Sequence, residues 1–149
     1  RSTLMRSSAA SDVYKRQLYT PDASVRFINV NNKGTVDYYN EMPYVFRNSR
    51  INLNITLRSI KSGIPLRCMD ICGAGGFLLS NYQEDLYDVF VPGEDMVIYD
   101  SIDDLITKCK YYLSHDVERR QIAQNGFGKI EEKHTYDVRF EEIFNMVFN

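Results

Sequence analysis

The stretch from residue 51 to residue 81, INLNITLRSIKSGIPLRCMDICGAGGFLLSN, decides the fold of this 149-residue chain. It opens with a short apolar run, residues 51–55, that is typical of a buried strand. A loop containing Pro65 leads into the start of a helix, and the glycine-rich residues 73–76 then precede a second apolar strand, residues 77–79. Strand, loop, helix and strand in this order predict a βαβ unit, whose first loop is a common position for a bound phosphate.

The segments around this unit continue the alternation of strands and helices. Residues 25–30 (VRFINV) and 96–99 are predicted strands, residues 84–90 a short helix, and residues 38–50 a helix with Pro43 in its first turn. Proline is tolerated there because its missing N–H would have no intrahelical acceptor. Short apolar strands between helices predict a parallel sheet with helices on both faces. The expected fold class is therefore α/β, a small parallel sheet flanked by helices.

The last third of the sequence is predicted to be helical. Ser101, with an acidic residue three positions later, is a variant of the capping box and opens one amphipathic helix. Asp116 is a candidate cap for a second helix, which Gly126 and Gly128 weaken. Thr135 opens the last helix. An aromatic stripe on this last helix is expected to belong to the core rather than to a ligand site: Tyr136, Phe140, Phe144 and Phe148.

Composition limits the classes of function. With 44% hydrophobic and 26% charged residues, the chain can bury one core, which is one domain's worth. A net charge of −2 with interspersed signs disfavours nucleic acid as a partner. The odd count of three cysteines favours a reducing compartment, and no apolar run reaches the roughly twenty residues of a membrane span. We expect a cytoplasmic protein without a transmembrane segment or a nucleic acid partner.

Metal binding is also disfavoured by the sequence. Cys68 and Cys72 lie four positions apart on one predicted helix, but no His/Cys pair completes a zinc ligand set. The histidines, His115 and His134, fall at predicted helix ends, where packing or the helix dipole explains them. We therefore expect no metal and nominate no catalytic residue.

The first residues, 1–17 (RSTLMRSSAASDVYKRQ), show no helical or strand period. Their tail, SAASDVYKRQ, resembles translated sequencing-adapter sequence, and a disordered Ser/Arg leader is the alternative. A signal peptide is excluded because no apolar segment is present. We expect residues 1–17 to be a non-native or disordered leader, and residues 18–149 to form one N-terminally truncated domain.

The glycines at residues 73–76 suggest a dinucleotide-binding fingerprint, but their order in the chain is wrong for it. That fingerprint needs a strand before the glycines and a helix after them. Here a helix precedes and a strand follows. The glycines are therefore expected to end the helix in a left-handed cap and to allow close packing of helix and strand.

Arg67 and Asp70 are the residues of this stretch that could carry binding. They lie three positions apart and share a helix face. One interpretation is a local ion pair worth under about 1 kcal/mol. The other uses each group separately. Arg67, with backbone N–H groups of residues 63–66, would neutralise a diphosphate, and Asp70 would accept hydrogen bonds from two ribose hydroxyls. Spacing alone leaves both open.

The stretch resembles the donor-binding half of GT-B glycosyltransferases of the group-1 superfamily, and within it the CgeB-like spore maturation protein branch. There an acid opens an E-A-x-x-x-G-x-P segment and binds the ribose of a nucleotide sugar. Asp70 matches that acid, Gly75 the shared glycine, Arg67 the branch's leading arginine, and residues 75–79 (GGFLL) its strand entry. Ser62 stands where the superfamily often has a further glutamate. Similar residues continue in order: Asn81, Tyr82, Gln83, Leu86, Gly93, Tyr99, Asp100, Ser101, Asp104, Leu105, Tyr111, Tyr112, Leu113, Arg119, Gly126, His134, Thr135 and Tyr136.

The resemblance implies the C-terminal Rossmann-like domain of a bacterial GT-B enzyme. The parent protein would transfer a sugar from a nucleotide-diphosphate sugar to an acceptor bound by an N-terminal domain absent from this chain. No cofactor or metal is required. The last helix would cross back to that domain, which would leave part of the aromatic stripe exposed. The implied donor-binding residues are Ser62, Gly63, Ile64, Pro65, Leu66, Arg67, Asp70 and Gly75.

Two other functions stay open at this stage. The domain could bind nucleotides without turnover, as a regulatory module does. It could also keep the fold without the site, as a structural or spore-surface interaction domain would. This part of the protein alone is expected to bind donor weakly and to catalyse nothing, because the acceptor half is absent.

Overall fold

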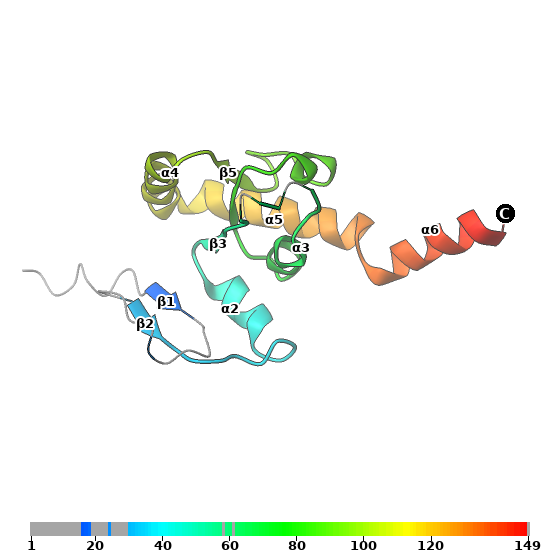
Figure 1. Ribbon diagram of the computed structural model, residues 1–149, viewed down its shortest axis with the longest axis horizontal. Coiled ribbons are helices and arrows are strands. Elements are labelled where there is room, and N and C mark those ends of the chain that lie inside the picture. The colour runs from blue at the N-terminus through cyan, green and yellow to red at the C-terminus, as the bar shows by residue number, and fades with distance from the viewer. Residues whose placement is uncertain (1–15, 19–23, 25–29, 58, 61, 149) are drawn as a thin grey trace, which may run out of the picture. The chain divides into compact units, whose positions relative to one another are not determined.

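The computed structural model describes residues 16–18, 24, 30–57, 59–60 and 62–148 (Figure 1). The chain forms two compact units, Arg1–Met42 and Pro43–Asn149. In the first unit, β1 (Arg16–Leu18) pairs in parallel with β2 (Val30–Asn32).

Most of the sequence expectations for the first unit lie outside the described residues. Of the predicted leader, Arg16 and Gln17 are described and form part of β1. Of the predicted strand at 25–30, Val30 is described and begins β2. An Asx turn follows β2, because the N–H of Gly34 donates to the Asn32 side chain over 3.0 Å and Gly34 has a φ of 78°.

The second unit carries the sheet and most of the helices. Its elements, in chain order, are α2 (Met42–Asn48), β3 (Asn52–Asn54), α3 (Leu66–Gly73), β4 (Leu78–Asn81), the 3₁₀ helix η1 (Glu84–Asp88), β5 (Val97–Tyr99), α4 (Ile102–Ser114), α5 (Asp116–Lys133) and α6 (Tyr136–Phe148).

The three strands of this unit form a parallel sheet in the order β3-β4-β5. The expected α/β class and βαβ unit are confirmed, with β3 and β5 shorter than their predicted runs and β4 displaced from residues 77–79 to residues 78–81. The helix expected over residues 38–50 begins later, at Met42, and keeps Pro43 in its first turn. The short helix expected after β4 is the 3₁₀ helix η1.

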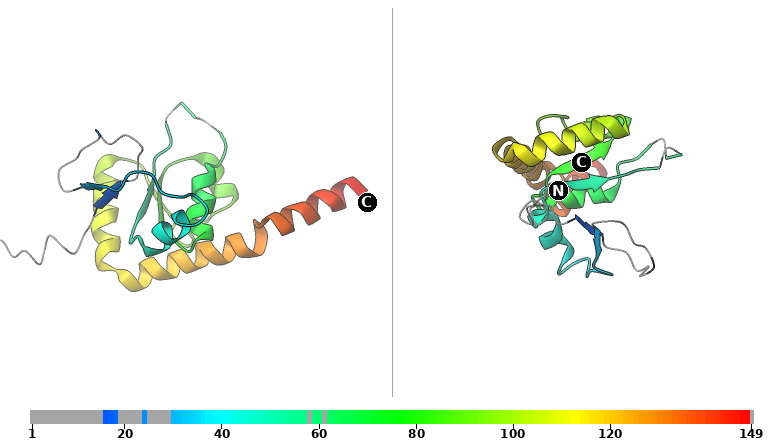
Figure 2. Two further views of the ribbon diagram at one scale, coloured as in Figure 1. Left: turned by 90° about the horizontal axis from the view of Figure 1, so that it is seen from below. Right: turned by 90° about the vertical axis from the view of Figure 1, so that its left-hand side faces the viewer.

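Helices cover both faces of the sheet, and alternate strand residues supply two buried clusters (Figure 2). Leu78 and Ile98 pack with α3, which contributes Cys68, Ile71 and Cys72. On the opposite face the buried cluster joins strand residues to α4 and α5: Phe77, Leu79, Val97, Tyr99, Tyr112 and Ile122. Because β4 and β5 are buried on both faces, their sequences, LLSN and VIY, show no alternation of apolar and polar residues.

Gly126 is not the weak point of α5 that the sequence suggests. The helix runs unbroken past both Gly126 and Gly128. A Cβ at position 126 would lie 2.5 Å from the backbone oxygen of Asp95, whereas one at position 128 would meet nothing within 4 Å. Gly126 therefore allows α5 to approach the loop before β5. Tertiary packing, rather than the helix itself, requires a glycine at this position.

The helix starts agree with the sequence in one case and not in the other. Ser101 caps α4, because its hydroxyl accepts from the N–H of Asp104 over 3.1 Å. Asp116 does not cap α5; it is the first helical residue, and His115 holds the cap position without a side-chain bond. The carboxylate of Asp116 instead accepts from the buried Arg119 over 2.7 Å. Arg119 also donates to the carbonyl of Tyr112.

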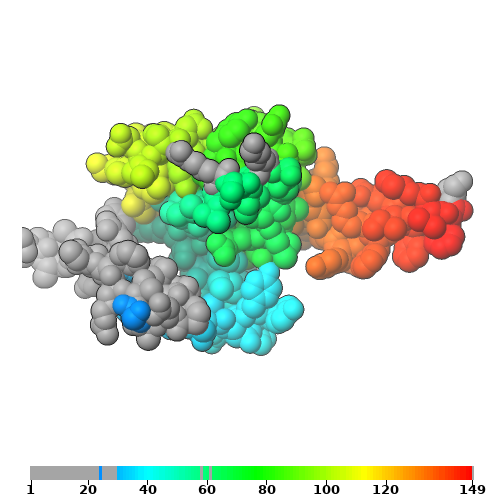
Figure 3. All heavy atoms as spheres, in the orientation of Figure 1, coloured from blue at the N-terminus to red at the C-terminus, as the bar shows by residue number. Residues whose placement is uncertain are grey.

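The aromatic stripe of α6 is exposed, so the expectation from helical spacing that it belongs to the core is wrong, whereas the exposure that the resemblance implied for part of it is observed. Tyr136 is 80% exposed and Phe140 54% exposed, and the two rings stack at 6.3 Å. Phe144 and Phe148 repeat this arrangement at 5.9 Å. Figure 3 shows α6 extending beyond the rest of its unit. Helical spacing predicts one apolar face correctly, but it does not predict whether another element packs on that face.

Candidate functional site

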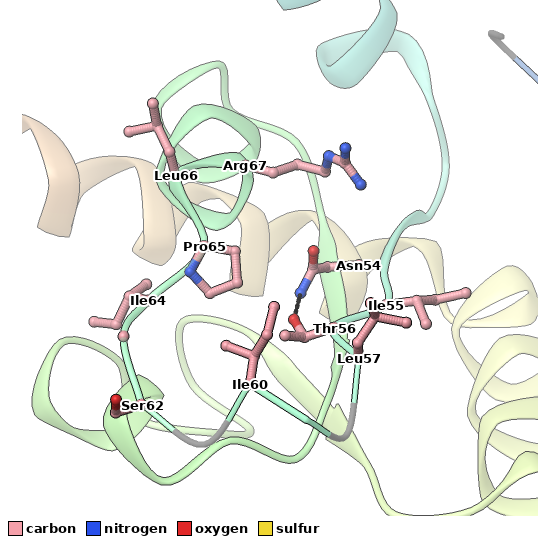
Figure 4. Close-up of a pocket in the computed structure, with 11 residues that line it drawn as sticks. Asn54, Ile55, Thr56, Leu57, Ile60, Ser62, Ile64, Pro65, Leu66 and Arg67 are labelled. Atoms are coloured by element: carbon pink, nitrogen blue, oxygen red, sulfur yellow. Dashed lines mark hydrogen bonds between the residues drawn. The ribbon is translucent and has the colours of Figure 1, made fainter.

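A cavity of about 460 Å³ opens between the end of β3 and the start of α3 (Figure 4). It lies at the carboxyl edge of the parallel sheet, where α/β proteins commonly bind ligands. Its lining consists of Asn54, Ile55, Thr56, Leu57, Ile60, Ser62, Gly63, Ile64, Pro65, Leu66 and Arg67. The structure thus brings together every sequence-predicted site residue from 62 to 67.

Arg67 is the charged residue of this lining, among the residues that the structure describes. It is the second residue of α3 and is exposed. Figure 4 shows its side chain reaching from α3 past Asn54, while the side chain of Leu66 points away. In the first turn of α3 the N–H of Cys68 donates to the carbonyl of Pro65 over 2.8 Å, whereas those of Leu66 and Arg67 have no intrahelical acceptor, and Pro65 at the cap position supplies no side-chain bond. Positive charge and helix N–H groups therefore meet at one end of the cavity, an arrangement suited to an anion.

Asp70 and Gly75 do not line the cavity. Asp70 lies one turn beyond Arg67 on the same face of α3 and is half-buried. Gly75 follows the opposite end of the helix, which over eight residues is about 12 Å long. A ligand that extends along α3 from Arg67 would therefore meet Asp70 before Gly75.

Gly75 and Gly76 end α3 in a Schellman motif. The N–H of Gly75 donates to Cys72 over 2.9 Å, that of Gly76 donates to Ile71 over 2.8 Å, and Gly75 has a φ of 76°. A Cβ at position 76 would lie 2.7 Å from the side-chain nitrogen of Asn52. The expected left-handed helix stop and close helix–strand packing are confirmed.

A buried polar network forms the floor of the cavity. The amide of Asn54 donates to Ser80 over 3.0 Å and to Thr56 over 3.2 Å, and the hydroxyl of Thr56 donates to Gln83 over 3.0 Å. Asn81 accepts from the N–H of Thr56 over 2.8 Å. In the described part of the chain, every buried side-chain nitrogen and oxygen has a partner. The floor is therefore fixed by bonds that sequence reasoning missed, since three of these four bonds join residues 25 to 27 positions apart.

The loop above this floor is held by a residue that sequence reasoning also missed. The N–H of Gly63 donates to the carboxylate of Asp85 in η1. Gly63 has a φ of 93°, a conformation that residues with a side chain rarely adopt. Neither residue signals the other locally, because they lie 22 positions apart.

The cysteines and histidines are placed away from this cavity. Burial raises the pKa of Cys68 to about 11 and raises that of Cys72 further, so both thiols are protonated at neutral pH. Among the described residues, no three His, Cys, Asp or Glu side chains are grouped to hold a metal ion. His115 stacks on Tyr111 at 3.8 Å, and burial, with the nearby Arg139, lowers the pKa of His134. As expected, both histidines lie at helix ends.

The chain resembles known proteins both in sequence and in fold. Residues 4–145 match the family model described as glycosyl transferase-like. No curated protein matches the chain. None of the helices in the described residues has both the length and the apolar character that crossing a membrane requires.

Solved structures with the same fold include the C-terminal domain of a group 1 family glycosyl transferase (LpcC) from Francisella tularensis. The TM-score is 0.59 at 19% identity, over 72% of this chain and 55% of that one. Sucrose-phosphate synthase from Thermosynechococcus elongatus gives 0.66 at 12% identity, over 80% of this chain and 30% of that one. TarM gives 0.64 at 14% identity, over 81% and 24%. The chain thus spans about half the length of the first of these structures and less of the other two. At these identities the likeness shows the fold, that of a GT-B C-terminal domain.

Proposed function

The chain belongs to the glycosyl transferase-like family, and on that premise we propose that it is the nucleotide-sugar-binding part of a glycosyltransferase. The observation that carries the proposal is the cavity at the start of α3, whose charged lining residue is Arg67. Within the family we propose the CgeB-like branch, on the order Arg67, Asp70 and the GGFLL segment at residues 75–79.

In the proposed binding mode, each part of the donor meets a different feature of the cavity. Arg67 and the first-turn amides of α3 bind the diphosphate, because fixed charge and oriented N–H groups both favour an anion. The carboxylate of Asp70, one turn along the same helix face, accepts hydrogen bonds from the ribose hydroxyls. The N–H of Gly63 is engaged by Asp85, so the diphosphate relies on Arg67 and α3.

The proposed reaction of the whole protein is displacement of a nucleoside diphosphate from a sugar. The bond between the anomeric carbon and the diphosphate oxygen breaks, and a bond from that carbon to an acceptor oxygen forms. The acceptor loses its proton to a base outside this cavity. The diphosphate leaves with both electrons of the broken bond, and Arg67 stabilises the negative charge that develops on it.

Titration calorimetry tests this proposal with UDP-, GDP-, ADP- and dTDP-sugars as probes. One of these donors should bind the chain, and Arg67→Ala should weaken its binding by about 10- to 100-fold, the usual range for a hydrogen bond to a charged group. Arg120→Ala is the matched control, because the Arg120 side chain is 78% exposed on α5 and does not line the cavity. Absence of binding by all four donors, or equal binding by Arg67→Ala, would contradict the proposal.

A second candidate is nucleotide binding without turnover. It is favoured by one observation: the described lining contains no carboxylate or histidine that could move a proton. The same titrations separate the two functions. A transferase should bind the nucleotide sugar and the free nucleoside diphosphate with different affinities, because its site also contacts the sugar. A nucleotide-binding module should bind both equally.

A further inference from the structure

We propose that Asp85 is a positioning residue for the candidate site, which holds the loop before α3 in the shape that presents Arg67 to the ligand. This inference rests on the proposed function, because it concerns the same cavity. It starts from the hydrogen bond between the N–H of Gly63 and the carboxylate of Asp85.

The element that carries Asp85 is itself fixed in the core. Leu86, the next residue of η1, is fully buried in the cluster under α3, and Phe90 is buried beside it. The N–H of Phe90 donates to the carbonyl of Leu86 over 2.8 Å. Because the buried Leu86 anchors η1 in the core, the carboxylate of the neighbouring Asp85 is a fixed acceptor for the loop.

The same element also holds the floor of the cavity. Gln83, which precedes η1, accepts from the hydroxyl of Thr56 over 3.0 Å. One short segment therefore contacts the floor through Gln83 and the loop through Asp85. Because Thr56 and Gly63 both line the cavity, these two bonds set the separation between floor and loop.

Among the described residues of the loop, those before Gly63 offer little packing, whereas Ile64 after it is partly buried against the core cluster. Leu57 and Ile60 are 70% and 50% exposed, and they are joined by one backbone bond of 2.9 Å from the N–H of Ile60. Figure 4 shows Ser62 and Ile64, the two neighbours of Gly63, on the strand of loop that leads into α3. A bond at Gly63 therefore fixes the loop just before the helix that carries Arg67.

The charge of Asp85 has a second consequence. A backbone N–H in a left-handed loop is a group that a phosphate oxygen can bind, and here a carboxylate already accepts from it. Asp85 thus keeps an anionic ligand away from Gly63 and leaves Arg67 as its partner. Asp85→Ala would remove the acceptor and loosen the loop. Asp85→Asn would keep an acceptor oxygen and remove only the repulsion between the carboxylate and an anionic ligand.

Hydrogen exchange of the Gly63 amide tests the positioning role without any ligand. Asp85→Ala should raise the exchange rate of this amide about tenfold, because the N–H loses its acceptor. Asp85→Asn should keep the wild-type rate, since the amide oxygen can still accept. Asp88→Ala, at the other end of η1, is the matched control and should leave the rate unchanged. Equal rates in the wild type and in Asp85→Ala would overturn the proposal.

Binding of UDP, GDP, ADP and dTDP, with their sugars, is the second readout. Asp85→Ala should weaken binding about tenfold, and Asp85→Asn should bind at least as tightly as the wild type. A residue that only stabilised the fold would lower the Tm in Asp85→Ala and leave affinity unchanged, and that result would overturn the proposal. Absence of nucleotide binding by the wild type would overturn the proposed function instead, and the exchange measurement would still decide whether Asp85 positions the loop.

Discussion

The two ends of α3 are built in opposite ways. At the C-terminal end, Gly75 and Gly76 bring the backbone into close contact with Asn52 and the carbonyl of Phe46, with no room for a methyl group at position 76. At the N-terminal end the chain is open, and Arg67 stands exposed over a cavity. One helix of eight residues thus ends in close packing and begins in a candidate binding site.

The contrast shows why a glycine-rich segment is a poor guide to a binding site. The glycines that suggest nucleotide binding instead end α3, because the N–H groups of Gly75 and Gly76 donate to carbonyls of the helix over 2.9 and 2.8 Å. The features that suit an anion are at the start of the helix, where Arg67 and the first-turn amides lie. Position relative to the helix, rather than residue type, separates the two roles.

The largest effect on stability is expected at Gly76. Gly76→Ala would place a Cβ 2.7 Å from the Asn52 side chain and 2.9 Å from a backbone oxygen, so strand and helix must move apart. We expect the free energy of unfolding to fall by about 3 kcal/mol, measured by urea denaturation. Gly128→Ala is the control: its Cβ would meet nothing within 4 Å in a helix interior, and it should gain up to about 1 kcal/mol. A Gly76→Ala variant as stable as wild type would contradict this account of the packing.

A smaller effect on stability, but a clearer test of function, is expected from the same substitution near the two ends of α3. Gly75 and Gly63 have φ values of 76° and 93°, and in both cases a Cβ would meet nothing within 4 Å. Gly75→Ala and Gly63→Ala should therefore each cost about 1 to 2 kcal/mol of stability from backbone strain alone. Nucleotide titration should separate them: only Gly63→Ala should weaken binding. Equal loss of affinity in both variants would remove the functional distinction between the two ends.

The two buried cysteines of α3, Cys68 and Cys72, are expected to be unreactive towards thiol reagents at neutral pH. Because burial raises the pKa of Cys68 to about 11, iodoacetamide at pH 8 should label the half-buried Cys109 well before Cys68 or Cys72. The pKa of the Cys68 thiol is 9.0 in the unfolded chain and about 11 in the folded chain. The stabilisation that comes from keeping this thiol protonated is therefore complete below pH 9 and is lost as the pH rises towards 11. Cys68→Ala should flatten that part of the pH profile. Labelling of Cys68 as fast as that of Cys109 would contradict this expectation.

The fold was predictable wherever its cause is local. The order of helix, glycines and strand predicted the helix stop at Gly75, and the spacing from Ser101 to Asp104 predicted a cap. Gly126 could not be understood in this way, because the atom that excludes a side chain there belongs to Asp95, 31 positions earlier. Periodicity likewise did not reveal what packs on the α6 stripe, and the exposure of part of it was expected from the resemblance alone.

The candidate site was predictable along one segment and no further. Residues 62–67 are continuous in the sequence, so a loop before a helix, which here lines the cavity, could be predicted there. The floor and the loop are held by Gln83 and Asp85, which come from the segment after β4. Single polar residues in a short polar segment give no pattern, and only the folded chain brings them to Thr56 and Gly63.

The measurement that tests the central claim most directly is an NMR titration of the backbone amides with the nucleoside diphosphates UDP, GDP, ADP and dTDP. The account predicts that shifts on binding cluster at residues 63–70, at the start of α3, and that residues 73–76 stay unchanged. Arg67→Ala should move these shifts to about 10- to 100-fold higher nucleotide concentration while leaving the free energy of unfolding within about 0.5 kcal/mol of wild type, as expected for an exposed side chain. Shifts centred on residues 73–76, or shifts that appear at the same nucleotide concentration in Arg67→Ala, would contradict the assignment of binding to the N-terminal end of this helix.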